Sequence, residues 1–409
     1  MFPLSVLLKK FIREGRLAIY DARGRRHAFG NGSGEPIVLR IHDKATEWAL
    51  LLNPQLTVGE AYMDGRLTVE NGDIASLLDL LTRNLSMGFG GFHWEWLNTA
   101  RCLTRRWMQR NTLSRAKTNV AHHYDLSGKL YDLFLDSDKQ YSCAFFETPQ
   151  DNLETAQANK CRRIIAKLDL KPDQRVLDIG SGWGGLGLHM ARSERVDVIG
   201  ITLSEEQLKI ARDRAARQGI CDRVRFRLED YRKVVGPFER IVSVGMLEHV
   251  GVAHYQDYFD RIAALLADDG VALVHAIGRS DGPGVTNPWI AKYIFPGGYT
   301  PALSEVVPPI QKSGLMITDI EILRLHYAMT LAQWRQRFVT NWERAKQLYD
   351  ERFCRMWEFY LAGAEMAFRN QGLMVFQIQL AKRVDALPIV RDYMIPVTSD
   401  IPDRRKNAA

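Results

Sequence analysis

The feature of this sequence that most restricts its fold is a glycine-rich turn directly after a short apolar run. Residues 176–185 read Val-Leu-Asp-Ile-Gly-Ser-Gly-Trp-Gly-Gly, a pattern typical of a β-strand, a tight turn and the start of a helix. Glycines in such a turn let the backbone approach a ligand closely. The turn therefore indicates both a strand–helix unit and a candidate binding site.

Strand and helix patterns alternate around this turn from residue 152 onward. Alternation at this spacing predicts a doubly wound α/β domain, in which helices cover both faces of a parallel sheet. The expected strands are Arg175–Ile179, Asp197–Ile201, Val224–Leu228, Arg240–Val244 and Val271–Val274, and the expected helices include Leu153–Leu168, Ser204–Gln218 and Tyr255–Leu266.

The first part of the chain follows a different pattern. A chain of 409 residues is long enough for two domains. We expect a small α+β domain over residues 1–118 and a larger α/β domain over residues 119–409. In the small domain the expected strands are Leu17–Asp21 and Ile37–Ile41, and the expected helices are Ala45–Leu52 and Asp73–Arg83.

Composition narrows the class of protein. Hydrophobic residues make up 46% and charged residues 25%, which is ordinary for a folded protein and excludes a largely disordered or fibrous chain. No apolar run approaches the roughly 20 residues that span a bilayer. The net charge of +7 permits an anionic partner, either nucleic acid or a phospholipid surface. Five scattered cysteines without C-x-x-C spacing argue against a disulfide framework or a zinc site, and for a reducing compartment.

Basic residues cluster between the two expected domains. Residues 101–120 hold six Lys and Arg side chains and no acid, and Trp94, Trp96 and Trp107 lie in or near this segment. A solvated basic linker is one interpretation. The other is a segment that rests on anionic lipid head groups, where each basic residue near the surface contributes ~1 kcal/mol.

The glycine turn resembles a dinucleotide site but lacks one of its parts. Gly180, Gly182 and Gly185 fit the G-x-G-x-x-G fingerprint, yet the acid expected about 20 residues later for the ribose is missing. Asp178 instead precedes the first glycine. A carboxylate there disfavours a pyrophosphate and suits an ammonium or sulfonium group. S-adenosylmethionine carries both groups, so the turn predicts an S-adenosylmethionine site, with a plain tight turn as the alternative.

Polar or ionisable side chains occur at the carboxyl end of each expected strand. Ligands of open α/β sheets bind beyond these ends. A single such residue is more often a cap or turn residue, but five successive ends indicate a shared site. In strand order these residues are Asp178; Thr202, Ser204 and Gln207; Asp230 and Tyr231; Glu248 and His249; and His275.

Six segments carry more specific motifs, at residues 123–127, 140–146, 176–185, 201–207, 245–251 and 288–296. Together they resemble cyclopropane-fatty-acyl-phospholipid synthases and the related mycolic acid cyclopropane synthases. The resemblance runs from about residue 118 to about residue 390. Residues 1–118 resemble the extra N-terminal domain of the bacterial members that act on phospholipids. The resemblance implies a Rossmann-like methyltransferase fold for the larger domain.

The resemblance also implies a reaction. A methylene group from S-adenosylmethionine is added to the cis double bond of an unsaturated acyl chain in a membrane phospholipid, which becomes a cyclopropane ring. An isolated alkene is a weak nucleophile, so its attack on a sulfonium methyl needs tight alignment and a dry pocket. The attack leaves a carbocation on the acyl chain, and ring closure then needs a base. A carboxylate beside the cation could be alkylated, and the resemblance implies a bound bicarbonate ion as the base.

Two sets of site residues follow from the resemblance, and no metal site is expected. The base site would be formed by Cys143, Glu248, His275, Ile277 through its backbone, and Tyr327. The cofactor site would be formed by Tyr124 and Ser142 over the methionine end, Asp178, Gly180, Gly182 and Gly184 along the turn, Thr202, Ser204 and Gln207 at the strand end that faces the ribose, and Asp230 near the adenine.

Several of these residues also have a purely structural interpretation. Glu248 could cap the following helix, whereas burial would raise its pKa so that it stays protonated and donates to an anion. His275 and Tyr327 could be core residues, and Cys143 a small buried hydrophobe. We do not expect Cys143 to be a nucleophile, because methyl transfer to an alkene needs no covalent enzyme intermediate. Ala364 stands where many relatives carry a Cys.

Aromatic residues recur near the end of the chain and have two interpretations. They either form an ordinary core helix or line a tunnel for the acyl chain, where their faces could also stabilise a passing cation. The residues concerned are Trp334, Phe338, Trp342, Phe353, Trp357 and Tyr360.

Other functions fit parts of the sequence. A fatty-acyl C-methyltransferase, which gives a methyl-branched or methylene product, begins with the same attack. A nucleic-acid methyltransferase would be expected to carry Asn/Asp-Pro-Pro-aromatic at the fourth strand end, where this chain has Leu247-Glu248-His249, so no nucleic-acid partner is expected. A lipid carrier with an inactive transferase would not be expected to keep Asp178 and Tyr327.

We expect a cytoplasmic enzyme attached peripherally to the inner membrane surface, and a homodimer is compatible with the sequence.

Overall fold

The computed structural model describes residues 1–88 and 128–395 of the chain. Three expectations lie outside these residues: the cofactor contact of Tyr124, the basic segment at residues 101–120 and the domain boundary between residues 118 and 119. Within the described ranges, no helix is both long and apolar enough to cross a bilayer.

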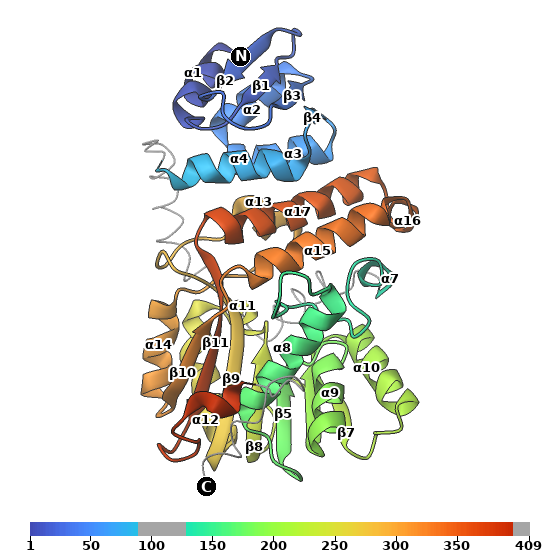
Figure 1. Cartoon of the computed structure of the whole chain (residues 1–409), viewed down its shortest axis with the longest axis vertical. Helices are drawn as coiled ribbons and strands as arrows, with labels where there is room; N and C mark the ends of the chain where they lie inside the picture. Colours follow the sequence, from blue (N-terminus) through green and yellow to red (C-terminus); the bar gives the residue numbers. More distant parts are fainter. Residues whose placement is uncertain (89–127, 396–409) are drawn as a thin grey trace.

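The N-terminal part of the chain forms a small mixed sheet with four helices (Figure 1). Its strand order is β2-β1-β3-β4, with β1 and β3 parallel and the other two pairs antiparallel. An α+β arrangement is therefore confirmed. The strands β2 and β4 were not expected, because both are short and largely exposed and so lack an apolar pattern. The elements are α1 (Phe2–Phe11), β1 (Leu17–Tyr20), β2 (Arg26–Phe29), β3 (Ile37–Ile41), α2 (Lys44–Leu52), α3 (Pro54–Met63), β4 (Leu67–Asn71) and α4 (Ile74–Ser86).

The larger part of the chain is built on a seven-stranded sheet with the order β10-β11-β9-β8-β5-β6-β7. The five strands from β9 to β7 are parallel, which confirms the expected doubly wound core. The strands are β5 (Arg175–Ile179), β6 (Asp197–Thr202), β7 (Val224–Leu228), β8 (Phe238–Val244), β9 (Leu266–Arg279), β10 (Met316–Ile322) and β11 (Leu373–Ala381).

Two details of this sheet differ from the expectation. The sheet is not purely parallel, because β11 runs antiparallel to both β9 and β10. The strand that we expected to end at Val274 continues to Arg279, since β11 pairs with it along its last nine residues. His275 therefore lies inside β9 and not at its end, with its backbone held in the sheet.

Helices cover both faces of the sheet, as expected. Neighbouring strand residues point to opposite faces: Val176 packs with α8 (Leu153–Leu168), α9 (Gly185–Glu194) and α10 (Glu205–Arg217), whereas Leu177 packs with α12 (Tyr255–Leu265) and α14 (Leu303–Lys312). The strands β5, β6, β8 and β9 are thus buried on both faces, which explains why they read as largely apolar runs. In the edge strand β7, Arg225 and Arg227 are exposed.

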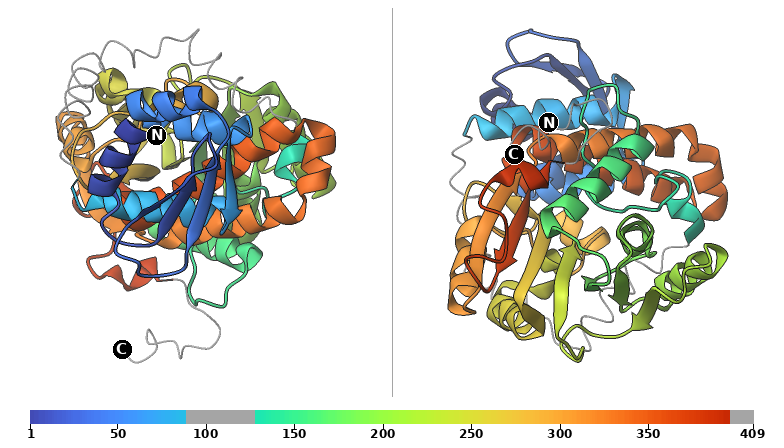
Figure 2. Two further views of the ribbon diagram at one scale, coloured as in Figure 1. Left: turned by 90° about the horizontal axis from the view of Figure 1, so that it is seen from above. Right: turned by 60° about the horizontal axis from the view of Figure 1, so that its bottom comes forward.

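A layer of helices lies between the two sheets (Figures 1 and 2). It contains α13 (Pro288–Tyr293), α15 (His326–Thr340) and α17 (Glu351–Asn370). Helices α3 and α4 pack against α17, and Ala362 and Met366 of α17 belong to the core of the N-terminal part. Polar contacts join the same surfaces: the Tyr62 hydroxyl donates to Glu358 at 2.6 Å, and Lys292 pairs with Glu60 at 2.6 Å. The two sheets are therefore joined through a shared helical layer.

Candidate active site

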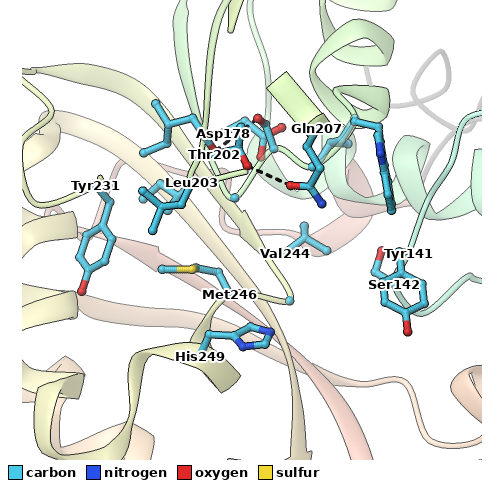
Figure 3. A pocket seen from close by; sticks show the side chains of 18 of the residues that line it. Tyr141, Ser142, Asp178, Thr202, Leu203, Gln207, Tyr231, Val244, Met246 and His249 are labelled. Carbon is cyan, nitrogen blue, oxygen red and sulfur yellow. Dashed lines mark hydrogen bonds between the residues drawn. The ribbon is translucent and has the colours of Figure 1, made fainter. Parts of the chain in front are cut away.

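A pocket opens at the carboxyl ends of β5, β6 and β8 (Figure 3). We call it the strand-end pocket. Asp178, the glycine turn, Thr202, Gln207 and Asp230 all line it, together with Tyr141 and Ser142 from the segment before α8. Parallel strands end at the same edge of a sheet, which is why polar residues that are far apart in the sequence meet here.

Asp178 places a buried carboxyl group at this pocket, and one of its oxygens has no partner among the described residues. Its side chain is 2% exposed, and its Oδ2 atom has no hydrogen-bond partner within the described part of the chain. Burial raises the pKa of Asp178 to about 7. A buried oxygen of this kind is costly unless a ligand or a proton satisfies it, so Asp178 suits a cationic ligand.

The glycine turn has the backbone conformation that only glycine adopts readily. Gly180 and Gly182 have φ angles of +81° and +54°, and a Cβ atom on Gly182 would meet nothing within 4 Å. Space beside this backbone is therefore open toward the pocket. Gly184 differs from the expectation: it does not line the pocket, and a Cβ atom there would lie 2.6 Å from the ring of Phe226, so it serves the packing of α9 on the sheet.

Two further strand ends supply hydrogen-bonding groups. The Thr202 hydroxyl donates to Gln207 Oε1 at 2.9 Å, which orients both side chains in the pocket (Figure 3). Ser204 differs from the expectation, because its hydroxyl accepts from the Gln207 backbone as the N-cap of α10 and it does not line the pocket. Burial alone would raise the pKa of Asp230, but two hydrogen bonds from Arg232 hold that pKa below its usual value.

These features fit S-adenosylmethionine better than a dinucleotide. The buried Asp178 carboxyl matches a positive charge, and the open glycine backbone admits an extended ligand. Thr202, Gln207 and Asp230 offer hydroxyl, amide and carboxylate groups to polar parts of the same ligand. An anionic pyrophosphate would meet Asp178 unfavourably.

A much larger cavity, of about 1010 Å³, adjoins the strand-end pocket. The two share four wall residues, Tyr141, Ser142, Gly245 and His249. All five residues of the expected base site line the large cavity: Cys143, Glu248, His275, Ile277 and Tyr327. The structure thus brings together residues from the segment before α8, from the short helix after β8, from β9 and from α15.

Glu248 does not cap a helix. It lies within α11 (Leu247–Val250), whose N-cap is Met246, and its Oε1 atom accepts from the Ile277 backbone N–H at 2.6 Å. Its Oε2 atom is buried and has no partner among the residues that the structure describes. Burial raises the pKa of Glu248 to about 7. The Ile277 N–H, expected to contact a bound anion, is therefore already engaged by Glu248.

His275 is held by a residue that the sequence did not single out. Its Nδ1 atom lies 3.1 Å from Nε2 of Gln377, which faces it across the β9–β11 pair. Burial lowers the pKa of His275 to about 3, so the ring is neutral. Because an amide nitrogen only donates, Nδ1 accepts and the ring proton resides on Nε2. The available signal was that Gln377 and Gln379 interrupt an otherwise apolar strand.

Cys143 and Tyr327 are both buried. The Cys143 thiol donates to the Ala144 carbonyl at 3.3 Å, and burial holds its pKa far above the usual range, so no thiolate forms. Tyr327 packs edge-on against Trp334 and beside Phe368. The protonated thiol agrees with the expectation that Cys143 is not a nucleophile.

Lys160 is a second residue that sequence reasoning missed. It is 1% exposed, and its ammonium group donates to Gln140 Oε1 at 2.5 Å and to the Ser142 hydroxyl at 2.9 Å. Ser142, which lines both cavities, is therefore oriented by a buried cation. The only sequence signal was a lysine on the face of α8 that also carries Cys161 and Ile164.

The aromatic residues divide between the two interpretations. Tyr360 lines the large cavity, and its hydroxyl lies 3.0 Å from that of Tyr141. The other five do not line it and instead pack in or against the core around α15 and α17, so for them the tunnel interpretation is wrong. These are Trp334, Phe338, Trp342, Phe353 and Trp357.

Comparison with known proteins gives consistent results. A family model described as mycolic acid cyclopropane synthetase matches residues 111–378, and one described as a domain of unknown function matches residues 9–89. The cyclopropane-fatty-acyl-phospholipid synthase of Escherichia coli K12 is 36% identical over 358 residues, which cover 87% of this chain and 90% of that protein. A probable fatty acid methyltransferase of Pseudomonas putida is 36% identical over 375 residues, covering 90% of this chain and 91% of the relative.

Solved structures show the same likeness. The cyclopropane synthase MmaA2 from Mycobacterium tuberculosis superimposes with a TM-score of 0.62 at 33% identity, over 65% of this chain and 98% of its own. The mycolic acid cyclopropane synthase CmaA1, complexed with SAH and CTAB, has a TM-score of 0.61 at 32% identity and is covered over 97% of its length by 64% of this chain.

Proposed function

This chain belongs to the mycolic acid cyclopropane synthetase family, and from that premise we propose that it converts the cis double bond of an unsaturated phospholipid acyl chain into a cyclopropane ring. It is an S-adenosylmethionine-dependent enzyme of the cyclopropane-fatty-acyl-phospholipid synthase class. The observation that carries the proposal is the contact between two cavities: one that presents the Asp178 carboxyl to a cationic methyl donor, and a large apolar one suited to a hydrocarbon chain.

In this proposal the strand-end pocket holds the donor. Asp178 faces its positive charge, the backbone of Gly180 and Gly182 runs beside it, and Thr202 with Gln207 contacts its polar groups. When bound there, S-adenosylmethionine supplies an activated methyl group. Ser142, held by Lys160, lies in the wall common to both cavities and so contributes to the alignment that an alkene nucleophile needs.

The base site is proposed to act on the acyl chain after methyl transfer. Protonated Glu248, neutral His275 with its proton on Nε2, and the Tyr327 hydroxyl are donors that line one cavity and fit a small anion. Bicarbonate held there would accept the proton that ring closure releases. The Ile277 N–H contributes indirectly, because it fixes the Glu248 carboxyl. Cys143 lines the cavity with a small neutral thiol, which does not repel a bound anion.

A fatty-acyl C-methyltransferase remains the second candidate, since a relative carries that description. The two are separated by incubating the protein with phospholipid vesicles and labelled S-adenosylmethionine, followed by mass analysis of the acyl chains before and after mild hydrogenation. A methylene product takes up hydrogen, whereas a ring largely resists it. Absence of label from the lipid would exclude both functions.

Attachment to a membrane surface is proposed from the N-terminal part. Phe2, Trp48 and Leu52 are 80%, 57% and 73% exposed, and Lys9 and Lys10 follow in the last turn of α1. Exposed apolar and basic groups together favour an anionic lipid surface. Residues 1–118 would then form a lipid-associated domain. Co-sedimentation with anionic vesicles should weaken as salt rises; salt-independent sedimentation, or none, would contradict this.

The titration of Asp178 predicts how donor affinity depends on pH. Because the pKa of Asp178 is about 7, the residue is largely neutral at pH 6 and largely ionised at pH 7.5. A cation binds the ionised form, so its affinity should rise by up to about tenfold over this interval, with proton release. Isothermal titration in buffers of different ionisation enthalpy measures both effects. Asp178→Asn should bind weakly with a flat pH profile; an equally steep profile in this variant would show that another group titrates.

Gln377 is proposed as a positioning residue for His275. Gln377→Glu replaces the amide donor with an acceptor, which moves the ring proton to Nδ1 and should lower kcat by roughly ten- to a hundredfold. Nitrogen-15 chemical shifts of the ring report the tautomer directly. Gln379→Leu is the matched control, because Gln379 lies on the same face of β11 but bonds to the Lys167 carbonyl. Its kcat should stay within about twofold, since it contacts no base-site residue. An unchanged tautomer with reduced kcat would refute the positioning role.

A further inference from the structure

The large cavity does not end at the base-site residues but continues into the interior of the N-terminal part. We propose that this extension holds the second hydrocarbon chain of a diacyl lipid while the reacting chain lies beside Glu248 and His275, an inference that rests on the proposed function. We call the extension the N-terminal chamber. Its walls include Leu8, Leu17, Leu39, Val58, Leu78 and Leu81.

The chamber is suited to hydrocarbon. The cavity as a whole measures about 1010 Å³, which is at the upper limit of the roughly 300–1,000 Å³ that ordinary ligand pockets occupy. The side chains that α1, α3, α4, β1 and β3 contribute to it are almost all aliphatic or aromatic. Among the described residues of the N-terminal part, none that lines the cavity is charged. A polar ligand would therefore leave its hydrogen-bonding groups unsatisfied in the chamber.

Small residues on α17 keep the chamber connected to the base site. Gly363, Ala364 and Ala367 line the cavity where α17 faces α4. Apart from its own helix, a Cβ atom on Gly363 would meet only Leu78 Cδ1, at 3.9 Å, within 4 Å among the described residues. Gly363 lies in the interior of a 20-residue helix, where glycine is less stable than alanine. The small side chains leave space that larger ones would fill.

Polar residues also line the cavity, near the ends of β9 and α17. Arg279 lies two residues beyond Ile277 in β9, and Asp281 pairs with it at 2.7 Å. On the other side, the Asn370 amide donates to Asp79 at 3.0 Å and to Thr82 at 2.8 Å, which ties the end of α17 to α4. One cavity thus offers apolar walls in the N-terminal part, polar residues, and the walls beside the base site. A diacyl lipid carries the matching groups: two hydrocarbon chains and a polar head group.

A physical reason favours the second chain as the occupant. Every methylene group moved from lipid into water costs free energy. When one chain of a diacyl lipid enters the protein, the lipid rises from the bilayer and its other chain begins to lose its apolar surroundings. A second apolar chamber removes that cost. The methyl end of the reacting chain is the competing occupant, and it has no polar group for the polar residues that line the cavity.

The experiment compares two phospholipids that share the same unsaturated chain but carry a second chain of sixteen or of two carbons. The quantity measured is the ratio of their kcat/KM values in mixed micelles. Leu8→Trp and Val58→Trp fill the chamber from two different helices. Val6→Trp is the matched control, because Val6 lies on α1 but is 43% exposed and does not line the cavity. Donor affinity, measured by calorimetry, verifies that each variant is folded, and two chamber variants guard against a folding defect in one.

We expect the wild type to prefer the long second chain. Filling the chamber should lower that ratio by about tenfold in Leu8→Trp and Val58→Trp, and Val6→Trp should keep the wild-type ratio. An unchanged ratio in both chamber variants overturns the proposal. A chamber variant that discriminates instead by the length of the reacting chain beyond its double bond assigns the chamber to that chain and also overturns it. Failure of the wild type to convert either lipid refutes the proposed function itself.

Discussion

We expect Glu248→Ala to lower kcat for ring formation by roughly 10²–10³-fold, the loss that follows removal of one preorganised hydrogen-bond donor from a dry site. Glu248 places a buried carboxyl oxygen in the large cavity, and its pKa of about 7 keeps much of it protonated at neutral pH. The affinity for S-adenosylmethionine should not change, because Glu248 does not line the strand-end pocket. Single-turnover kinetics and calorimetry measure the two quantities separately.

Glu248→Gln distinguishes the protonated from the ionised form. An amide oxygen still accepts from the Ile277 N–H, and an amide nitrogen still donates into the cavity, so the loss should stay within about tenfold. In the wild type, the protonated form of Glu248, which donates a hydrogen bond, is lost as the pH rises through about 7. The rate should fall with it. The Gln variant should lack this fall. Full activity of Glu248→Ala would show that the base site is elsewhere.

Removing dissolved carbon dioxide should lower the rate at least tenfold, because a positioned base contributes roughly 10²–10⁴-fold. Adding bicarbonate should restore the rate, whereas an equal concentration of chloride should not. His275→Ala should raise the bicarbonate concentration that gives half of the maximal rate, since the ring proton on Nε2 is one of the donors in the cavity. The rate is measured as label transferred to lipid under carbon-dioxide-free gas.

A rate that does not depend on bicarbonate would contradict this proposal. The Glu248 carboxylate would then be the remaining candidate for the base. In that case Glu248→Gln, which cannot accept the proton, should lose activity as fully as Glu248→Ala. The two variants and the gas experiment therefore assign the base between bicarbonate and Glu248.

Local patterns predicted most elements of the larger domain. The expected bounds of β5, β7 and α8 agree with the structure, because each combines a clear apolar period with a clear end signal. Asn152 caps α8 through its side chain, and Gly180 begins the turn after β5 with a positive φ angle. Strands β10 and β11 were not predicted from the sequence. Strand β10 follows α14, and β11 follows the long helices α15 and α17. Nothing local indicates that β11 will pair with both β9 and β10.

Part of the cofactor site could also be predicted from neighbouring residues in the sequence. Asp178, Gly180 and Gly182 lie within five residues of one another, and their charge and backbone freedom indicate the type of ligand. The base site could be named only by resemblance. Lys160 and Gln377 act on Ser142 and His275 across 18 and 102 residues of sequence, so the pattern around each could not predict its partner.

The sequence by itself determined the strand–helix order, the glycine turn and the charge that faces the donor, because each depends on neighbouring residues. Only the tertiary structure decided that Glu248 engages the Ile277 backbone, that an antiparallel β11 brings Gln377 to His275, and that the large cavity reaches into the N-terminal part. These features arise where segments far apart in the chain pack together. Such contacts depend on how the whole chain packs, so a short segment of the sequence cannot predict them.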